Sequence, residues 1–246
     1  MSLQVLRIRK LFAALPDSFS RKALKLGVVP TVEHDRILGN LNPSFVFDVG
    51  ANRGQFAASV RRAYPAVKIV SFEPLPSPLS TLRELFEGDP NFEARPLALS
   101  SKPGEAEFHV SGKDDSSSLL RIGELQEQLF SGTAQVATMP VDVSTLALEA
   151  QELDLGDSAL LKADIQGGEF SLLKGAGEAL NRFRYVYLEL SLTELYEDQV
   201  LITDVVSHLH SHGFALTDIG NLERGPKGTA VQGDFLFQQR PDHVTP

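Results

Sequence analysis

Apolar runs alternate with segments of helical spacing along most of the chain. Residues 44–49 form a short apolar run that stops at a glycine-rich turn, which is typical of a buried parallel strand. Residues 56–64 carry apolar side chains on one helical face, and Pro65 follows them. The alternation continues, so it predicts an α/β fold with a doubly wound, mostly parallel sheet whose last two strands form an antiparallel edge. Further strands are expected at 67–72, 92–97, 159–165, 185–190, 215–219 and 231–239, and further helices at 79–86, 169–180 and 202–212.

The alternation breaks between about residues 100 and 140. Residues 105–110 and 135–141 alternate in polarity as strands do, and a polar loop, 112–118, lies between them. We interpret this stretch as an antiparallel insertion with a mobile loop that could close over a substrate. A plain surface linker is the alternative.

The first 41 residues have a different pattern. Residues 3–41 predict two or three short helices broken near Pro16 and Pro30, the first of them amphipathic. We therefore divide the chain into an N-terminal helical appendage, 1–41, and a main domain, 42–246. We expect the appendage to pack on the main domain. Contact with a membrane surface and a homodimer interface are the alternatives.

Composition narrows the classes of function. The 246 residues carry 23 Lys and Arg against 32 Asp and Glu, a net charge of −9, which disfavours binding to nucleic acid. The absence of cysteine excludes disulfides, thiolate metal sites and cysteine nucleophiles. No apolar run approaches the roughly 20 residues that span a bilayer, and the N-terminus lacks the apolar core of a signal peptide. We expect a cytoplasmic protein with no stable membrane insertion.

Candidate ligand-binding residues follow the first strand. Ligands of doubly wound sheets bind at the carboxyl ends of the strands, where this chain reads Asp48-Val49-Gly50-Ala51-Asn52-Arg53-Gly54. Gly50 and Gly54 fit a nucleotide-binding turn, but Asn52 replaces the middle glycine that lets a pyrophosphate approach. Asp48 would face an amino group or orient the loop, and would repel a diphosphate. The turn, with Ala51, favours a ligand that has an amine and a carboxylate and that meets backbone N–H groups.

The second strand ends at Glu73 and Pro74, 19 positions after Gly54. An acidic residue at this distance accepts hydrogen bonds from both ribose hydroxyls, and Pro74 offers an apolar face to a base. The two strand ends thus indicate one ligand with an amino-acid end and a ribose end, as in S-adenosylmethionine. A plain tight turn beside a solvated Glu73 is the alternative. An NAD-linked oxidoreductase is disfavoured by Asn52.

Two longer motifs resemble the FkbM family of class I methyltransferases. The first combines residues 47–54 with Phe72-Glu73-Pro74. The second and more specific is 161–176, L-K-A-D-I-Q-G-G-E-F-S-L-L-K-G-A, which resembles the family pattern K-h-D-h-E/Q-G-x-E followed by L-K-G-A, where h is apolar. Residues 187–190 and 233–237 also match the downstream pattern, so the resemblance covers about 44–240.

The resemblance implies a Rossmann-like sheet of seven strands, mostly parallel, with an antiparallel last strand. It also implies O-methylation that uses S-adenosylmethionine and acts on a hydroxyl of a sugar, glycolipid or natural product. A small molecule or a glycan is therefore the expected partner. A module that binds the nucleoside or a partner protein without catalysis is the alternative.

Three carboxylates are candidates for catalysis. A sugar hydroxyl is a poor nucleophile at neutral pH, so Asp164, at the end of the fourth core strand, is our candidate base or acceptor-orienting group. Glu189 on the fifth strand and Glu169 at the next helix start are candidate helpers. Structural alternatives are an Asp164–Lys162 pair, a polar network around Glu189, and stabilisation of the helix N-terminus by Glu169. Carboxylates can hold Mg²⁺, but no ligand spacing demands it, so we expect no metal.

Overall fold

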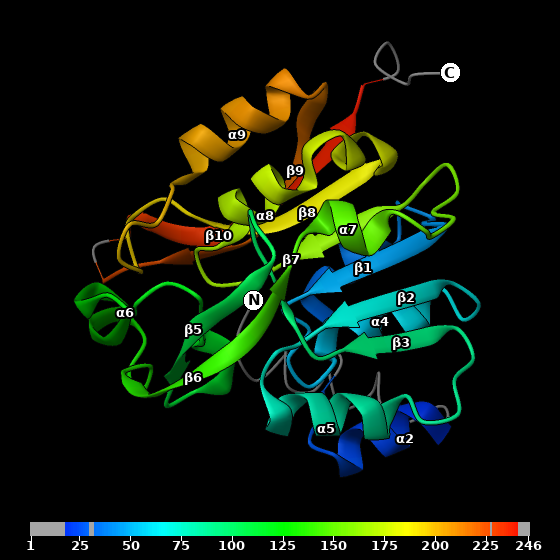
Figure 1. The fold of residues 1–246 in the computed structure, drawn as a ribbon, viewed down its shortest axis with the longest axis horizontal. Helices are drawn as coiled ribbons and strands as arrows, with labels where there is room; N and C mark the ends of the chain where they lie inside the picture. Colours follow the sequence, from blue (N-terminus) through cyan, green and yellow to red (C-terminus); the bar gives the residue numbers. More distant parts are fainter. Residues whose placement is uncertain (1–17, 30–31, 227, 241–246) are drawn as a thin grey trace.

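The computed structural model of the protein describes residues 18–29, 32–226 and 228–240. The expected amphipathic helix at the start of the chain and the breaks at Pro16 and Pro30 lie outside the described residues. Figure 1 shows a twisted sheet with helices packed against it and a smaller sheet beside its central strands.

Seven strands form the main sheet in the order β3-β2-β1-β7-β8-β10-β9. All neighbouring pairs are parallel except the two pairs of β10, which runs antiparallel to both β8 and β9. The predicted fold, seven mostly parallel strands with an antiparallel last strand, is confirmed. The strands are β1 (Phe45–Val49), β2 (Lys68–Phe72), β3 (Phe92–Arg95), β7 (Leu160–Ala163), β8 (Tyr185–Ser191), β9 (Phe214–Arg224) and β10 (Ala230–Gln239).

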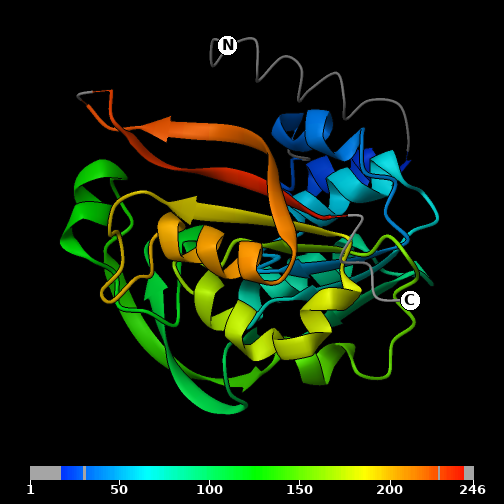
Figure 2. The same cartoon turned by 90° about the horizontal axis from the view of Figure 1, so that it is seen from above.

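β1 is buried on both faces, so its alternate side chains enter two different cores. Phe45, Phe47 and Val49 pack in the core on the side of α7, α8 and α9. Val46 points the other way and packs with α4, α5 and the N-terminal helices. Figure 2 shows these two layers on opposite faces of the sheet. The helices are α2 (Ser18–Lys25), η1 (Val32–His34), α3 (Asp35–Leu38), α4 (Gln55–Ala63), α5 (Pro76–Leu85), α7 (Leu146–Ala150), α8 (Glu169–Ala176), η3 (Gly177–Arg182) and α9 (Ile202–Ser211).

The described part of the N-terminal segment packs directly on the main sheet. Ala23, Ile37 and Leu38 are almost fully buried in the same core as α4 and α5. Arg62 of α4 pairs with Asp35 at the start of α3. This segment therefore shares a core with the main sheet, and η1 brings it to the carboxyl ends of the central strands.

The predicted insertion forms a separate sheet of three strands, in the order β4-β6-β5. β5 and β6 are antiparallel, as expected, and β4 adds in parallel to β6. The expected strand 92–97 ends at Arg95, because Pro96 has no N–H to give to a ladder, and β4 follows it in the smaller sheet. The elements of the insertion are β4 (Ala98–Leu99), β5 (Gly104–Ser111), η2 (Asp114–Ser116), α6 (Glu124–Leu129) and β6 (Gln135–Ser144).

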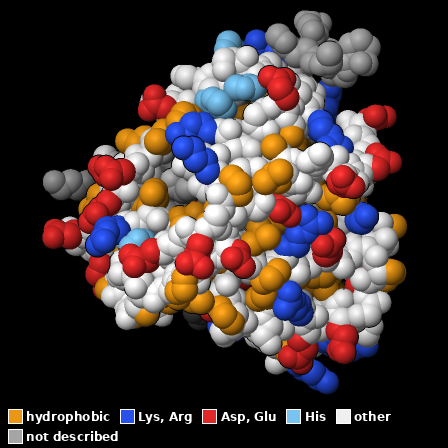
Figure 3. Space-filling model, in the orientation of Figure 1, with side chains coloured by type: hydrophobic (Ala, Val, Ile, Leu, Met, Phe, Trp, Pro, Cys, Tyr) orange, Lys and Arg blue, Asp and Glu red, His pale blue; other side chains and the backbone are white. Residues whose placement is uncertain are grey.

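Charged side chains are mixed over the face drawn in Figure 3. Acidic and basic groups lie close to one another there, and no broad basic surface of the kind that binds nucleic-acid backbones is visible. Within the described residues, no helix has the length and apolar character required to cross a bilayer.

Candidate functional site

The turn after β1 lies against the turn after β7. Gly50 has a φ of 71°, and a Cβ built there would lie 1.9 Å from the carbonyl oxygen of Asp164, so this position requires glycine. Gly54 begins α4 with a φ of 94°, and a Cβ there would lie 2.7 Å from the side chain of Leu82 on α5. Gly50 therefore permits close contact between two strand ends, whereas Gly54 permits close packing of two helices.

The backbone N–H groups of this turn are not arranged as we expected. Each N–H from residue 50 to residue 54 donates to an acceptor within the chain, at 2.8–3.1 Å. The tight turn brings these groups against the end of β2, where the carbonyl of Phe72 and the carboxylate of Glu73 accept three of them. The donors left for a ligand are therefore side chains and the first turn of α4, whose N–H groups have no acceptor within the helix.

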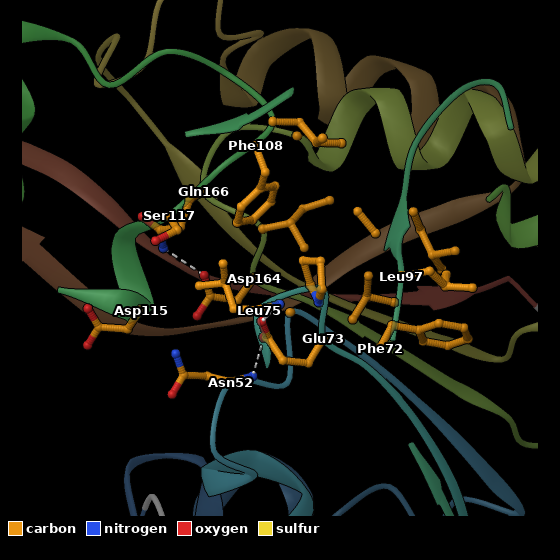
Figure 4. Close-up of a pocket in the computed structure, with 18 of the residues that line it drawn as sticks. Asn52, Phe72, Glu73, Leu75, Leu97, Phe108, Asp115, Ser117, Asp164 and Gln166 are labelled. Atoms are coloured by element: carbon orange, nitrogen blue, oxygen red, sulfur yellow. Dashed lines mark hydrogen bonds between the residues drawn. The ribbon is translucent and has the colours of Figure 1, made fainter. Parts of the chain in front are cut away.

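Glu73 joins the ends of β1 and β2. Its side chain is buried, Oε2 accepts from the N–H of Asn52 at 2.9 Å, and Oε1 accepts from the N–H of Leu75 at 2.8 Å. Figure 4 shows Glu73 and Asn52 on the same side of the pocket. Burial raises the pKa of Glu73 to about 7, although the two backbone donors oppose the rise. This carboxylate therefore titrates near neutral pH.

Asp48 lies behind the turn. Its carboxylate is fully buried, with Oδ1 3.2 Å from Nζ of Lys162. The ammonium of Lys162 also donates to the carbonyl of Gly50 at 3.2 Å. Burial would lower the pKa of Lys162, but the charges of Asp48 and Asp164 outweigh it and raise that pKa. Asp48 thus fixes Lys162, and Lys162 fixes the turn, which leaves one ammonium donor to face a ligand.

The turn after β7 brings two candidate carboxylates together. Gln166 has a φ of 55° and Gly167 a φ of 95°, so the chain reverses sharply after Asp164. Nε2 of Gln166 donates to Oδ1 of Asp164 at 2.7 Å and to Oε2 of Glu189 at 2.8 Å. The hydroxyl of Tyr196 donates to Oε1 of the same amide at 2.6 Å. Gln166 therefore links Asp164 to Glu189 and is itself held by Tyr196.

The two candidate helpers, Glu189 and Glu169, differ in position. Glu189 lines the crevice on β8, and burial together with the charge of Asp164 raises the pKa of Glu189 well above its ordinary value. Glu169 starts α8 behind the turn, where its Oε1 accepts from the N–H of Ile165 at 2.9 Å. Burial raises the pKa of Glu169 to about 7. The contacts of Glu169 are with the backbone of the turn, so it positions Asp164 from behind.

A polar network of His34, Tyr187 and Asp234 was not anticipated from the sequence. Nδ1 of His34 lies 2.8 Å from the hydroxyl of Tyr187, which donates to Oδ2 of Asp234 at 3.0 Å. Burial and the charge of Lys162 lower the pKa of His34 to about 4, and burial raises the pKa of Asp234 to about 6. The histidine is therefore neutral at pH 7.

The signals for this network in the sequence are weak. Asp234 is a charged residue within an apolar strand pattern, which marks a polar partner nearby. Tyr187 stands in the run 187–190 that matched the family pattern without an assigned role. No local sequence pattern indicates the role of His34, because 153 positions separate it from its partner Tyr187.

Three adjoining cavities meet at the carboxyl ends of the strands. The apolar cavity lies between the ends of β1 and β2 and the insertion, and its wall includes Glu73 and Pro74. The central cavity is lined by Ala51, Lys162 and the His34 network. The insertion cavity lies between residues 113–133 and strands β8 to β10.

Asp164 and Asp115 line all three cavities. Gly50 and Asn52 line both the apolar and the central cavity. In Figure 4, Asp164 lies between Gln166 and the pair of Asn52 and Glu73. The structure therefore brings the residues predicted from the first turn, the second strand end and the fourth strand to one crevice. Asp48, Gly54 and Glu169 support that crevice from outside its walls.

Comparisons with known proteins agree with this geometry. Residues 48–216 match the family model described as the methyltransferase FkbM domain. The 2-O-methyltransferase NoeI of Sinorhizobium fredii is 29% identical over 206 residues, which cover 78% of this chain and 78% of that protein. Methyltransferase 1 of Beauveria bassiana is 26% identical over 188 residues, which cover 70% of this chain and 73% of that protein.

A solved structure from Klebsiella pneumoniae, assigned as an O-methyltransferase, has a similar fold. Its TM-score is 0.52 at 12% sequence identity, and the match covers 96% of this chain and 96% of that chain. At this identity the likeness concerns the fold alone. His34 and Asp234 lie outside the 48–216 match, so the walls of the crevice include residues that the family model does not cover.

Proposed function

The chain belongs to the FkbM methyltransferase family, and from this premise we propose that it transfers the methyl group of S-adenosylmethionine to a hydroxyl oxygen of a sugar, glycolipid or natural product. The name of the relative from Sinorhizobium fredii, a 2-O-methyltransferase, supports oxygen as the accepting atom. The observation that carries the proposal is the place of Asp164, where the three cavities meet.

The apolar cavity fits the adenosine end of the cofactor. Its wall combines Phe72, Pro74, Leu97 and Phe108, which suit a flat base, with the carboxylate of Glu73. Each oxygen of Glu73 accepts one backbone hydrogen bond and retains a lone pair, so both can accept from ribose hydroxyls.

The central cavity fits the amino-acid end. It places the ammonium of Lys162 on its wall, where this group can pair with the α-carboxylate. Gln55 and Phe56, in the first turn of α4, lie on the same cavity, and the free N–H groups of a first turn favour a carboxylate. Gly50 and Asn52 then face both ends of the ligand.

The cofactor supplies an electrophilic sulfonium methyl group when bound, and the residues of the chain position and activate the acceptor. We assign Asp164 as the base that takes the hydroxyl proton, because it lines both the insertion cavity and the cofactor cavities. Glu189, whose pKa is raised by burial, favours its protonated form and can donate a hydrogen bond beside Asp164. Gln166 and Glu169 fix the turn that carries Asp164.

The experiment that tests the proposal combines calorimetry and a transfer assay. The purified protein is titrated with S-adenosylhomocysteine and then incubated with methyl-tritiated cofactor and a panel of glycosides, glycolipids and polyketide alcohols. We expect micromolar binding and label on a hydroxyl oxygen of one acceptor class. Binding without transfer to any hydroxyl would favour a nucleoside-binding module, and binding of NADH in its place would favour an oxidoreductase. The homodimer and the cytoplasmic location stay predictions.

A further inference from the structure

The insertion cavity is separate from the walls assigned to the cofactor. It lies between residues 113–133 of the insertion, the turn after β7 and strands β8 to β10. It meets the apolar and central cavities at Asp115 and Asp164. A molecule bound in it therefore reaches Asp164 without entering the two cavities that fit the cofactor.

The wall of this cavity is polar and carries an excess of negative charge. Its described lining includes four carboxylates, those of Asp115, Asp164, Glu189 and Glu223, against the single ammonium of Lys113. Because Glu189 favours its protonated form, the acidic groups that set the charge of the wall are the other three carboxylates, against one ammonium. A further anion in this cavity would be repelled, whereas a neutral group that donates hydrogen bonds would be attracted.

Gln126 provides independent evidence for a ligand. Its side chain, on α6, lines the cavity and is 3% exposed, and its Oε1 has no hydrogen-bond partner among the described residues. Buried polar atoms without a partner are rare in folded proteins, because they lose their hydrogen bonds to water without compensation. An amide oxygen can only accept, so the missing partner is an O–H or N–H donor. Phe130 also lines the cavity and adds an apolar residue to its wall.

Resting on the proposed methyl transfer, we propose that the insertion cavity binds the acceptor as a neutral sugar ring and that Gln126 accepts a hydrogen bond from one of its hydroxyls. A neutral polyol supplies many O–H donors to a wall rich in acceptors and one C–H face to Phe130. A uronate or a sugar phosphate is disfavoured by the charges of Asp115, Asp164 and Glu223. The insertion thus determines the specificity of the enzyme.

Binding of glycosides to the cofactor-saturated protein tests the proposal. Methyl glycosides of glucose, galactose and mannose, and the matched uronates, are offered to the protein with S-adenosylhomocysteine, and binding is followed by saturation-transfer NMR. We expect at least one neutral glycoside to bind and its matched uronate not to bind. Gln126→Leu removes the hydrogen-bond acceptor and should weaken the affinity for that neutral glycoside at least tenfold. Gln128→Leu, at an exposed position of the same helix, should leave binding unchanged.

A second variant tests the charge of the wall without altering the buried Gln126. Glu223 is partly exposed, and Glu223→Gln lowers the negative charge of the wall, so it should allow the matched uronate to bind. The proposal is overturned if the unaltered protein binds uronates as well as neutral glycosides, if it binds no glycoside, or if Gln126→Leu changes nothing. Calorimetry with S-adenosylhomocysteine and the transfer assay distinguish the two proposals. A wrong acceptor class leaves cofactor binding and methyl transfer to another hydroxyl intact, whereas a wrong function removes cofactor binding or transfer to every hydroxyl.

Discussion

Oε2 of Glu73 lies 2.9 Å from the backbone nitrogen of Asn52, and this hydrogen bond joins the end of β2 to the turn after β1. The second oxygen of Glu73 is held by the N–H of Leu75. A ribose that meets this carboxylate therefore finds it already oriented, which reduces the entropy lost on binding.

Removal of this carboxylate should weaken cofactor binding. We expect Glu73→Ala to weaken the affinity for S-adenosylhomocysteine by about 1.5–3 kcal/mol, the range for hydrogen bonds to a charged acceptor. Isothermal titration calorimetry measures the change. Glu87→Ala, at an exposed glutamate after α5, is the control and should bind as the unaltered protein does. Equal affinity in the two variants would place the ribose elsewhere.

Cofactor affinity should depend on pH near neutrality. The ionised form of Glu73 accepts from ribose hydroxyls, and burial raises the pKa of Glu73 to about 7, so protonation below that pH removes an acceptor. We expect the affinity for S-adenosylhomocysteine to fall by up to about tenfold per pH unit below pH 7 and to be constant above pH 8. Calorimetry between pH 5.5 and 8.5 measures the profile. Glu73→Gln should flatten it, and a profile that persists in this variant assigns the titration to another group.

Gly50→Ala should destabilise the fold more than a substitution at an uncrowded glycine. A Cβ at Gly50 would lie 1.9 Å from the carbonyl oxygen of Asp164, so the β1 and β7 turns must separate. We expect a loss of about 3 kcal/mol or more in the free energy of unfolding, from backbone strain and overpacking together. Gly88→Ala is the matched control, because its φ of 82° is also positive but no atom lies within 4 Å of the built Cβ. Its cost should be about 1 kcal/mol. Urea unfolding that gives equal losses would contradict the contact.

Asp164→Asn should reduce turnover far more than cofactor affinity. Loss of a general base lowers kcat by about 10²- to 10⁴-fold. Tyr196→Phe removes the hydroxyl that holds Gln166 and should lower kcat by a smaller factor, with an unchanged KM for the cofactor, because Tyr196 positions the base through that amide. Steady-state kinetics with the acceptor found in the transfer assay measures both. Full activity of Asp164→Asn would remove Asp164 from the reaction.

Glu169 should make the protein less stable as the pH rises. Burial raises the folded-state pKa of Glu169 to about 7, so between its unfolded pKa and pH 7 the folded state binds more protons than the unfolded state. Ionisation of the buried carboxyl lowers the free energy of unfolding. This penalty is absent below pH 4 and complete above pH 7. Glu169→Gln removes this penalty. Its free energy of unfolding, relative to that of the unaltered protein, should therefore increase by about 3 kcal/mol between pH 4.5 and pH 8. Urea unfolding at the two pH values measures it, and a gain that does not depend on pH would show that Glu169 is not strained by its charge.

The sheet could be predicted because its strands are short, apolar and separated by helical spacing. β1 is buried at every position and apolar at every position except Asp48, because both of its faces are covered, and a nearly continuous apolar run is the sequence pattern of a central parallel strand. The short helix α6 was missed, because its sequence, Glu-Leu-Gln-Glu-Gln-Leu, is polar and only six residues long. The boundary between β3 and β4 was missed because the effect of Pro96 on the ladder was not weighed.

The crevice was accessible from the sequence where spacing determines position. Gly50, Glu73 and Asp164 each follow a parallel strand, and the carboxyl ends of such strands meet at one edge of the sheet. The sequence analysis predicts that the backbone donors of the first turn meet a ligand, whereas the tightness of the turn directs three of them to the end of β2 and the other two to acceptors within the turn. His34 and Gln126 depend on tertiary packing of distant segments, for which the local pattern contains no information.

The place of β10 between β8 and β9 has a consequence for synthesis on the ribosome. β9 leaves the ribosome before β10, yet β10 is the strand with which it pairs, so the nascent chain cannot add β9 to the sheet when it emerges. Asp234 arrives with β10, opposite Glu189, so the crevice is completed in the same step as the sheet. A chain arrested before β10 therefore presents the open edge of β8 and an unpaired β9 to chaperones and proteases.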